Sequence, residues 1–169
     1  MSEEEKSQYD IIAIRYMATT RKGKMTSLDW TKLADLAEFR YQLRRFVSFS
    51  EAACEAAGVS AQQYQLLQVV ATVPPDKESS ISYIAERMVV RHNSAVELVD
   101  RAEKAGLVHR VADKNDHRRS LVEITPRGNE LLAVLVPIHL AEVRTENGEL
   151  LRSLQQLIGL KTPSSKRGA

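Results

Sequence analysis

The chain has 169 residues, 43% of them hydrophobic and 27% charged, which is ordinary for a globular domain able to bury its own core. Only 5% of the residues are aromatic and only seven are glycine, a composition that favours helices over an all-β sandwich. The formal net charge of +2 is too small to identify a nucleic-acid partner.

Several classes of protein are excluded at this level. The single cysteine, Cys54, rules out an intramolecular disulfide and cysteine-based zinc sites. No metal-ligand spacing links the four histidines, His92, His109, His117 and His139. A glycine-rich phosphate loop and a nucleophile motif are both missing, so we expect no enzyme, metal or cofactor.

The N-terminus does not resemble an export signal or a membrane anchor. Residues 1–10 are polar and lean acidic, unlike a secretory signal. The apolar stretch 11–18 is interrupted by Arg15 and is shorter than the roughly 20 residues needed to cross a bilayer. We therefore expect a cytoplasmic protein without a membrane partner.

A long helix is predicted after an N-terminal extension at residues 1–26. Apolar residues recur with helical spacing from about Leu28 to Ala57, with Thr26 or Ser27 as the N-cap. Gly58 then provides a residue suited to the left-handed conformation that ends many helices. A helix of about 30 residues needs a partner along its length.

Three shorter helices follow. Ser60 and Gln63 form a capping-box pattern, and this helix stops at Pro74–Pro75. Residues 81–90 and 91–107 are then predicted as two short helices joined by a tight turn, which is a helix-turn-helix. In the second of them, the face opposite the apolar one is polar and exposed.

A β-hairpin and two further helices complete the pattern. Two β-prone runs, 107–112 and 120–124, are separated by a charged turn at 113–119. Thr125–Pro126 then supplies an N-cap and a favoured first helical residue. Apolar helices are predicted to follow at 126–145 and 149–160, and the tail 161–169 is predicted to be disordered. The fold class is therefore mainly α with a small β-hairpin, in which a winged helix-turn-helix is flanked by dimerisation helices.

The sequence resembles the MarR family from roughly Leu36 to Leu160. The segments that carry the resemblance are ISYIAERM, AVELVDRAEKAGLVHR and the wing DKNDHRRSLVEITPRG. In the wing, Asp116, Arg118, Ile124–Thr125 and Gly128 match the pattern of the family. The resemblance implies a domain at 27–160, with a DNA-binding lobe at 60–125 and dimerisation helices at 27–58 and 126–160.

The start of the helix 91–107 is the predicted reading element. A recognition helix offers the side chains of its N-terminal half to base edges in the major groove. Asn93 suits adenine, Arg91 suits guanine or a phosphate, and Val96 suits a thymine methyl. The complete set of residues expected at this surface is Arg91, His92, Asn93, Ser94, Val96 and Glu97. An ordinary solvated helix is the alternative, and the hairpin that follows favours DNA.

The hairpin tip is the second expected contact. Its basic residues Lys114, Arg118 and Arg119 would enter a flanking minor groove, although a solvated tip is the alternative. By the resemblance, Asp116 pairs with Arg118 or Arg119 and holds the wing in shape. Glu97 departs from the family, which commonly has a basic or polar residue there; it suits a cytosine amino group, or it weakens phosphate contact.

The resemblance also implies a small-molecule effector, such as an aromatic or phenolic compound, that relieves repression by changing the spacing of two recognition helices. Trp30, Tyr41 and Tyr64 are candidates to line its pocket, with core packing as the alternative that we favour. Cys54 lies among alanines near the end of the long helix, so we expect an inert buried thiol and not a redox sensor.

These patterns predict a DNA-binding transcription regulator, a ligand-responsive repressor that acts as a homodimer on a pseudopalindromic operator. The alternative is a winged helix that contacts another protein and has no sequence-specific DNA binding. Salt discriminates between them, because binding through phosphates weakens steeply with ionic strength.

Overall fold

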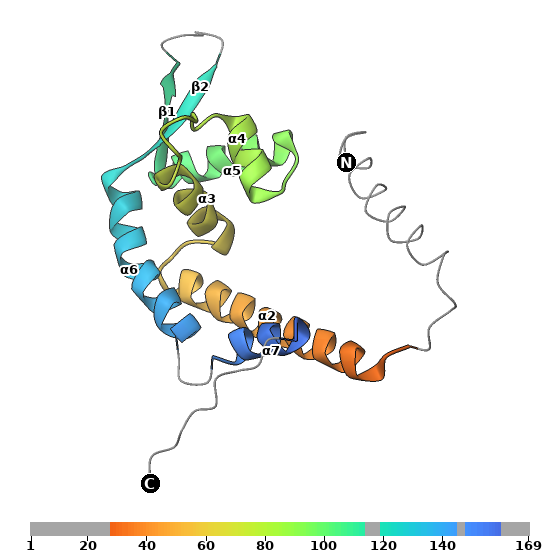
Figure 1. Ribbon diagram of the computed structural model, residues 1–169. Coiled ribbons are helices and arrows are strands. Elements are labelled where there is room, and N and C mark those ends of the chain that lie inside the picture. Colours follow the sequence, from red (N-terminus) through yellow and green to blue (C-terminus); the bar gives the residue numbers. More distant parts are fainter. Residues whose placement is uncertain (1–27, 114–118, 145–147, 160–169) are drawn as a thin grey trace, which may run out of the picture.

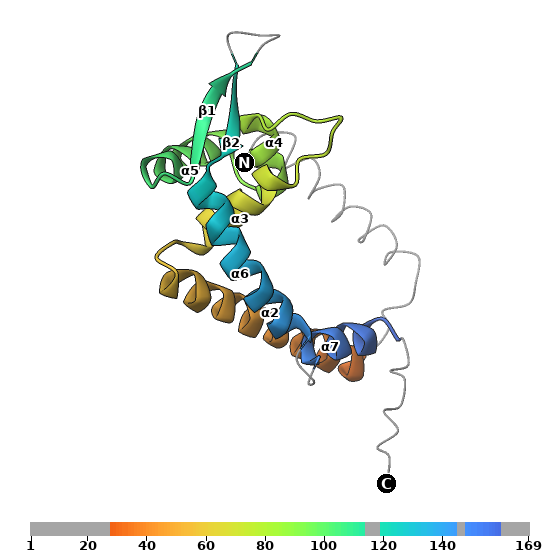
Figure 2. The ribbon, with the colours of Figure 1, turned by 90° about the vertical axis from the view of Figure 1, so that its left-hand side faces the viewer.

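The computed structural model describes residues 28–113, 119–144 and 148–159. In chain order they form α2 (Trp30–Ala56), α3 (Ala61–Ala71), α4 (Ile81–Met88), α5 (His92–Lys104), β1 (Val108–Ala112), β2 (Ser120–Ile124), α6 (Pro126–Arg144) and α7 (Glu149–Leu157). Figure 1 shows a lobe of α3, α4, α5 and the hairpin above α2 and α7. In Figure 2, α6 runs from the lobe down to the α2–α7 layer. The predicted mainly helical fold with a two-stranded hairpin is confirmed.

The long helix α2 was predicted to begin at about Leu28. It begins two residues later, at Trp30, because Asp29 is its N-cap. The Asp29 carboxylate accepts hydrogen bonds from the backbone N–H groups of Thr31 and Lys32, both at 3.1 Å. The prediction of Thr26 or Ser27 as the N-cap was therefore wrong; a carboxylate close to the first helical residue satisfies two orphan donors and the helix dipole together. At the other end Gly58 has φ +76°, as predicted.

The lobe has a single apolar core built from every one of its elements. The predicted capping box of Ser60 and Gln63 starts α3, and Ser80 caps α4 through the backbone N–H of Tyr83 at 3.2 Å. The buried residues of this core are Leu66, Leu67, Val70, Ile84, Ala85, Ala95, Leu98, Val99, Ala102, Leu107, Val108 and Val122. Because α4 and α5 both pack on α3 through this core, the helix-turn-helix is a rigid unit.

The hairpin is attached to the lobe at its base. Strands β1 and β2 pair antiparallel with Val108 opposite Ile124 and Ala112 opposite Ser120. The backbone N–H of Val122 donates to the Ser79 carbonyl at 2.9 Å, which ties β2 to the loop before α4. The wing therefore lies directly beside the loop that precedes the helix-turn-helix.

The hairpin leads directly into α6 through the predicted cap. The Thr125 hydroxyl accepts from the backbone N–H of Gly128 at 3.1 Å and donates to the carbonyl of Gly106 at 2.7 Å. A Cβ on Gly128 would stand 2.7 Å from a side-chain carbon of Ile124 and against the backbone oxygen of Leu107. A glycine is thus required where α6 crosses the end of the hairpin.

The joint between the lobe and α2 is a small buried cluster around His139, which is 8% exposed. Its Nδ1 lies 2.8 Å from the Leu135 carbonyl and its Nε2 lies 2.9 Å from the Ser50 hydroxyl. Because the carbonyl can only accept, Nδ1 donates to it, and Nε2 is left to bond with the Ser50 hydroxyl. The ring of Tyr64, on α3, lies tilted against the His139 ring with a centroid distance of 4.6 Å. Residues of α2, α3 and α6 therefore meet at this joint.

The turn of the helix-turn-helix contains an uncommon backbone conformation. Val89 has φ +54°, and it is the one non-glycine residue with positive φ among those described. A left-handed conformation costs an L-residue about 1–2 kcal/mol, and a β-branched side chain is poorly suited to it. The side chain is 79% exposed, so little packing offsets the cost.

Replacing Val89 by asparagine should therefore stabilise the protein. Asparagine tolerates the left-handed region, and we expect Val89→Asn to raise the free energy of unfolding by about 1 kcal/mol in urea denaturation. Val89→Ala keeps a Cβ but removes the branch, so its gain should be smaller. If Val89→Asn were less stable than the wild type, with an unchanged denaturant slope, this turn would not be strained.

Candidate nucleic-acid interface

The first element of the interface is α5, which has one face in the core and one in solvent. Ala95, Leu98, Val99 and Ala102 are at most 3% exposed. The residues expected to read bases lie on the remaining surface: Arg91, His92, Asn93, Ser94 and Glu97 are exposed and Val96 is half-buried. The structure thus gathers this predicted set at the N-terminal half of one anchored helix.

The N-terminus of α5 has no side-chain cap. Arg91 occupies the N-cap position and makes no capping hydrogen bond. A guanidinium has donors and no acceptor, so it cannot bind the first N–H groups of the helix. Those groups and the positive end of the helix dipole are suited to an anion supplied from outside, such as a phosphate.

The second element is the hairpin, of which both strands are described. Lys114, Asp116 and Arg118 lie outside the described residues, so the predicted role of Asp116 in shaping the wing stays a prediction. Arg119 is described and lies immediately before β2. Its guanidinium lies 3.0 Å from the carboxylate of Glu78 and 3.6 Å from that of Asp113.

A third feature fixes the hairpin against α5, and sequence reasoning missed it. The Arg110 guanidinium on β1 binds Asp100 at 2.6 Å and Glu103 at 2.5 Å, both on α5. The backbone N–H of Arg110 also donates to Glu103 at 2.8 Å. Asp100 and Glu103 are three residues apart and share a helix face, a signal that could have predicted a basic partner.

The Arg110 contacts change the acidity of Glu103. Hydrogen bonds donated by the backbone and then the side chain of Arg110 hold the pKa of Glu103 below its ordinary value of 4.5. A lowered pKa in the folded state means that the charged carboxylate stabilises the fold. This contribution is fully present above the unfolded pKa and is lost as the pH falls through the lower folded value.

We therefore expect Glu103→Gln to destabilise the lobe at neutral pH and not in acid. Loss of the charge-assisted bonds of a partly exposed group should cost about 1 kcal/mol at pH 7. The difference from the wild type should shrink as the pH drops below about 4.5, measured by denaturant unfolding across the pH range. Glu97→Gln, on the solvent face of α5, is the control and should show no such trend. A deficit in Glu103→Gln that is constant with pH would contradict the role of the charge.

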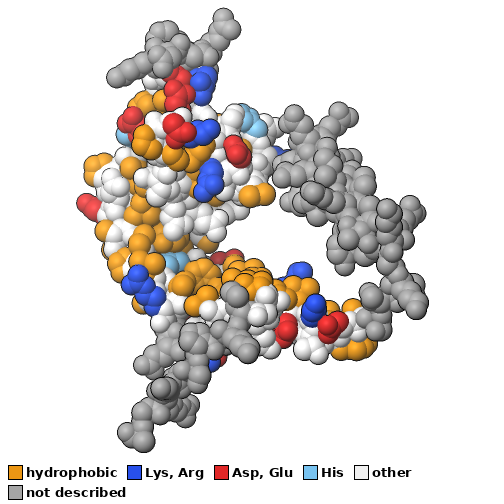
Figure 3. Space-filling view, in the orientation of Figure 1, with side chains coloured by type: hydrophobic (Ala, Val, Ile, Leu, Met, Phe, Trp, Pro, Cys, Tyr) orange, Lys and Arg blue, Asp and Glu red, His pale blue; other side chains and the backbone are white. Residues whose placement is uncertain are grey.

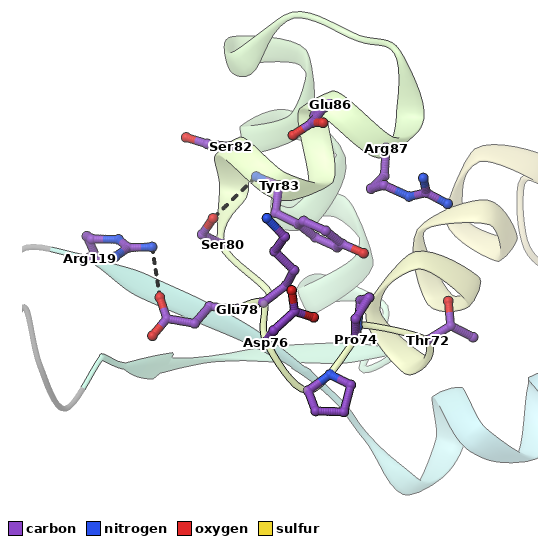
Figure 4. Close-up of a pocket in the computed structure, with 12 residues that line it drawn as sticks. Thr72, Pro74, Asp76, Glu78, Ser80, Ser82, Tyr83, Glu86, Arg87 and Arg119 are labelled. Carbon is purple, nitrogen blue, oxygen red and sulfur yellow. Dashed lines mark hydrogen bonds and ion pairs between the residues drawn. The ribbon is translucent and has the colours of Figure 1, made fainter.

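A polar cleft lies beside these elements. It has a volume of about 800 Å³ and is lined by residues of the loop before α4, by residues of α4 itself and by Arg119, which immediately precedes β2. Figure 4 shows Arg119 reaching Glu78 at one side of the cleft, with Tyr83, Glu86 and Arg87 contributed by α4. The cleft therefore separates the wing from the first helix of the helix-turn-helix.

The aromatic residues proposed for an effector pocket do not meet. Tyr64 is 2% exposed and packs with Cys54, whereas Trp30 is 73% and Tyr41 49% exposed. With a rise of 1.5 Å per residue, Trp30 lies about 36 Å along α2 from Cys54. These three residues therefore cannot line one pocket within a chain. Packing in the core, which we favoured for all three, applies to Tyr64 alone, because Trp30 and Tyr41 are exposed.

Cys54 is fully buried. Burial raises the pKa of its thiol, with a smaller opposing effect from a hydrogen bond to Ser50. A raised pKa keeps the thiol protonated and weakly nucleophilic. This environment agrees with an inert cysteine, which stays a prediction.

Two other properties can be stated for the part of the chain that the structure describes. It contains no cluster of three histidine, cysteine or acidic side chains arranged to hold a metal ion. None of its helices combines the length and the apolar character required to cross a membrane.

Comparison with known proteins agrees with this geometry. A family model described as the MarR family matches residues 57–119. A protein of Thauera aromatica, named as a transcriptional regulatory protein for the hcr operon, is 31% identical over 120 residues, covering 66% of this chain and 70% of its own. The transcriptional activatory protein BadR of Rhodopseudomonas palustris is 29% identical over 99 residues, and this chain spans 55% of its length.

Solved structures show the same fold. AbsC, a MarR family transcriptional regulator from Streptomyces coelicolor, superposes with a TM-score of 0.62 at 22% identity, over 80% of this chain and 93% of its own. MepR from S. aureus, solved as a DNA complex, gives a TM-score of 0.54 at 19% identity over 72% and 95%. An anchored, outward-facing second helix followed by a hairpin defines a winged helix-turn-helix protein. The chain belongs to the MarR family and is a transcriptional regulator.

Proposed function

We propose that this regulator binds double-stranded DNA in the cytoplasm as a homodimer and represses transcription from a pseudopalindromic operator. The observation that carries the proposal is the exposed N-terminal half of α5, held by a buried face within the same lobe as the wing. MepR, which shares the fold, was solved with DNA. We propose the lobe at 60–125 as the DNA-binding part.

In this proposal α5 lies in the major groove. Asn93 pairs with an adenine, and Arg91 pairs with a guanine or a phosphate. Val96, half-buried one turn further along, is placed for a thymine methyl, while Glu97 accepts from a cytosine amino group. His92 and Ser94, both exposed in the first turn, contact the backbone or neighbouring bases.

The second copy is proposed to cover an apolar stripe on α2. Leu33, Leu36, Leu43 and Val47 follow a heptad rhythm and are 41–47% exposed. The next positions of the same heptad repeat are Ser50 and Cys54, which are covered by α6 and α3. The same face is thus packed at the C-terminal end of α2 and uncovered along its N-terminal half.

Apolar residues of the last two helices extend this surface. Figure 3 shows an orange band over α2 and α7, facing the hollow beneath the lobe. Exposed apolar residues on α6 and α7 and directly after α7 are Val134, Ile138, Leu140, Val143, Leu151, Leu154 and Ile158. A patch of this extent on a monomer is typical of an interface, and two-fold symmetry would match a palindromic site.

Dimerisation predicts a change of mass when the stripe is charged. Light scattering at micromolar concentration should give about twice the chain mass of 19.0 kDa for the wild type. Leu43→Asp places a charge in the stripe and should shift the protein to monomer. Ser48→Asp adds the same charge at an exposed position of α2 outside the stripe and should remain dimeric. A monomeric wild type that still binds DNA tightly would contradict the architecture.

The regulatory part of the proposal follows from the family. We propose that a small aromatic or phenolic molecule changes the spacing of the two recognition helices and releases DNA. Trp30, Tyr41 and Tyr64 are no longer proposed as one pocket within a chain. Relatives of this chain include a named activator, BadR, and the sign of regulation depends on where the operator lies relative to the promoter. Transcription from a reporter carrying the operator should fall when the protein is present; a rise would show activation.

Base reading by α5 is tested by Asn93→Ala. A duplex selected by the wild-type protein from a random-sequence pool provides the probe, and fluorescence anisotropy measures affinity. Loss of a bidentate base contact should cost roughly 1–3 kcal/mol on this duplex, relax preference at one base position and leave the salt slope nearly unchanged. Lys104→Ala, at the far end of α5, should retain base preference. Equal losses on selected and scrambled duplexes for Asn93→Ala would contradict base reading by this residue.

A further inference from the structure

An ion-pair cluster lies at the end of the hairpin strands nearest the turn, where β1 ends and β2 begins. Arg119 is flanked by Glu78 at 3.0 Å and Asp113 at 3.6 Å, so one cation faces two carboxylates. Asp113 and Arg119 are also joined through the backbone, where the Asp113 N–H donates to the Arg119 carbonyl at 3.2 Å. Asp113 is 1% exposed and belongs to the hairpin, whereas Glu78 comes from the loop before α4 and its side chain is 41% exposed.

The cleft beside this cluster lies where a DNA backbone would pass. In helix-turn-helix complexes the first helix crosses the phosphate backbone while the second enters the major groove. Here the first helix is α4, and the cleft lies between it and Arg119, just before β2. Ser82, on the first turn of α4, also lines the cleft. The cleft therefore offers a site for a phosphate between α4 and the hairpin.

The charges of this site cancel in the free protein. Its lining includes three basic residues, Lys77, Arg87 and Arg119, and three acidic ones, Asp76, Glu78 and Glu86. A phosphate approaching Arg119 meets the carboxylate of Glu78 already bound to it. An exposed ion pair of this kind is worth about 0–1 kcal/mol, so exchange of the carboxylate for a phosphate is accessible.

We propose that Glu78 is an affinity-setting residue: it competes with the DNA backbone for the Arg119 guanidinium and thereby weakens phosphate binding beside the start of β2. The proposal rests on the proposed DNA-binding function. On binding, the Arg119–Glu78 pair opens and Arg119 contacts a phosphodiester oxygen, which leaves Glu78 close to the negatively charged backbone. Asp113 holds the Arg119 backbone and side chain beside the end of β1 through the exchange.

This competition makes an unusual prediction, because removal of an ion pair should improve binding. Glu78→Gln frees Arg119 and removes a repulsive charge, so affinity should rise about three- to tenfold at low salt on selected and scrambled duplexes alike. Glu86→Gln removes an acidic charge from the same cleft that has no ion pair with Arg119, and should change affinity by less than about twofold. Arg119→Ala should weaken binding to both duplexes by similar factors and lower the salt slope by about one unit.

The decisive comparison is a double-mutant cycle measured by fluorescence anisotropy. If Glu78 acts through Arg119, most of the gain from Glu78→Gln is lost in the Arg119→Ala background, and only the smaller gain from removing a repulsive charge remains. A gain of the same size in both backgrounds would show a general effect of charge and overturn the proposal. A loss of affinity in Glu78→Gln, with an unchanged melting temperature, would show that the pair positions the wing for binding, and would also overturn it. A wild type that binds neither duplex would overturn the DNA-binding function, and the competition with it; a binding wild type with an unaffected Glu78→Gln would overturn the competition alone.

Discussion

The architecture depends on the burial of one face of α5. Ala95, Val99 and Ala102 have no exposed surface, and Leu98 has only 3%. Small residues at two of these positions allow α5 to lie close to α3 and α4, so that the polar half of the helix cannot turn inward. Each buried side chain contributes on the order of 1 kcal/mol or more through the hydrophobic effect. The orientation of Asn93 and its neighbours is therefore a consequence of core packing, with no contribution needed from the DNA.

Polar interactions then fix the orientation of the secondary-structure elements relative to one another. Arg110 fixes β1 against α5 through Asp100 and Glu103, so the hairpin and the helix form one unit. His139 of α6 performs a similar task further down, where its bond to Ser50 joins α6 to α2 and its ring packs against Tyr64. These two joints differ in exposure, because the first faces solvent and the second is buried.

Local signals in the sequence were sufficient for most of the fold. The Ser60–Gln63 capping box, the Thr125–Pro126 start of α6 and the left-handed Gly58 are short-range chemistry, and each is found where it was predicted. The cap of α2 was misplaced because several capping residues stand close together before Trp30, and their competition is decided by backbone geometry. The exposed set on α5 followed from helical periodicity.

Long-range pairs were not predictable in this way. Arg119 contacts Glu78, which is distant in the chain, only because β2 lies beside the loop before α4. Likewise, Trp30 and Tyr64, two of the aromatic residues considered for one pocket, are separated by most of the length of α2.

The central claim is that α5 and the wing bind DNA by reading bases and neutralising phosphates. The most direct measurement is a titration of the wild-type protein against its selected duplex and a scrambled duplex at several salt concentrations. The account predicts a dissociation constant that rises linearly with salt on a double-logarithmic plot, and an affinity for the selected duplex about 10³-fold or more above that for the scrambled one. Binding that is insensitive to salt, or equal on the two duplexes, would contradict it and favour a winged helix that serves protein contact.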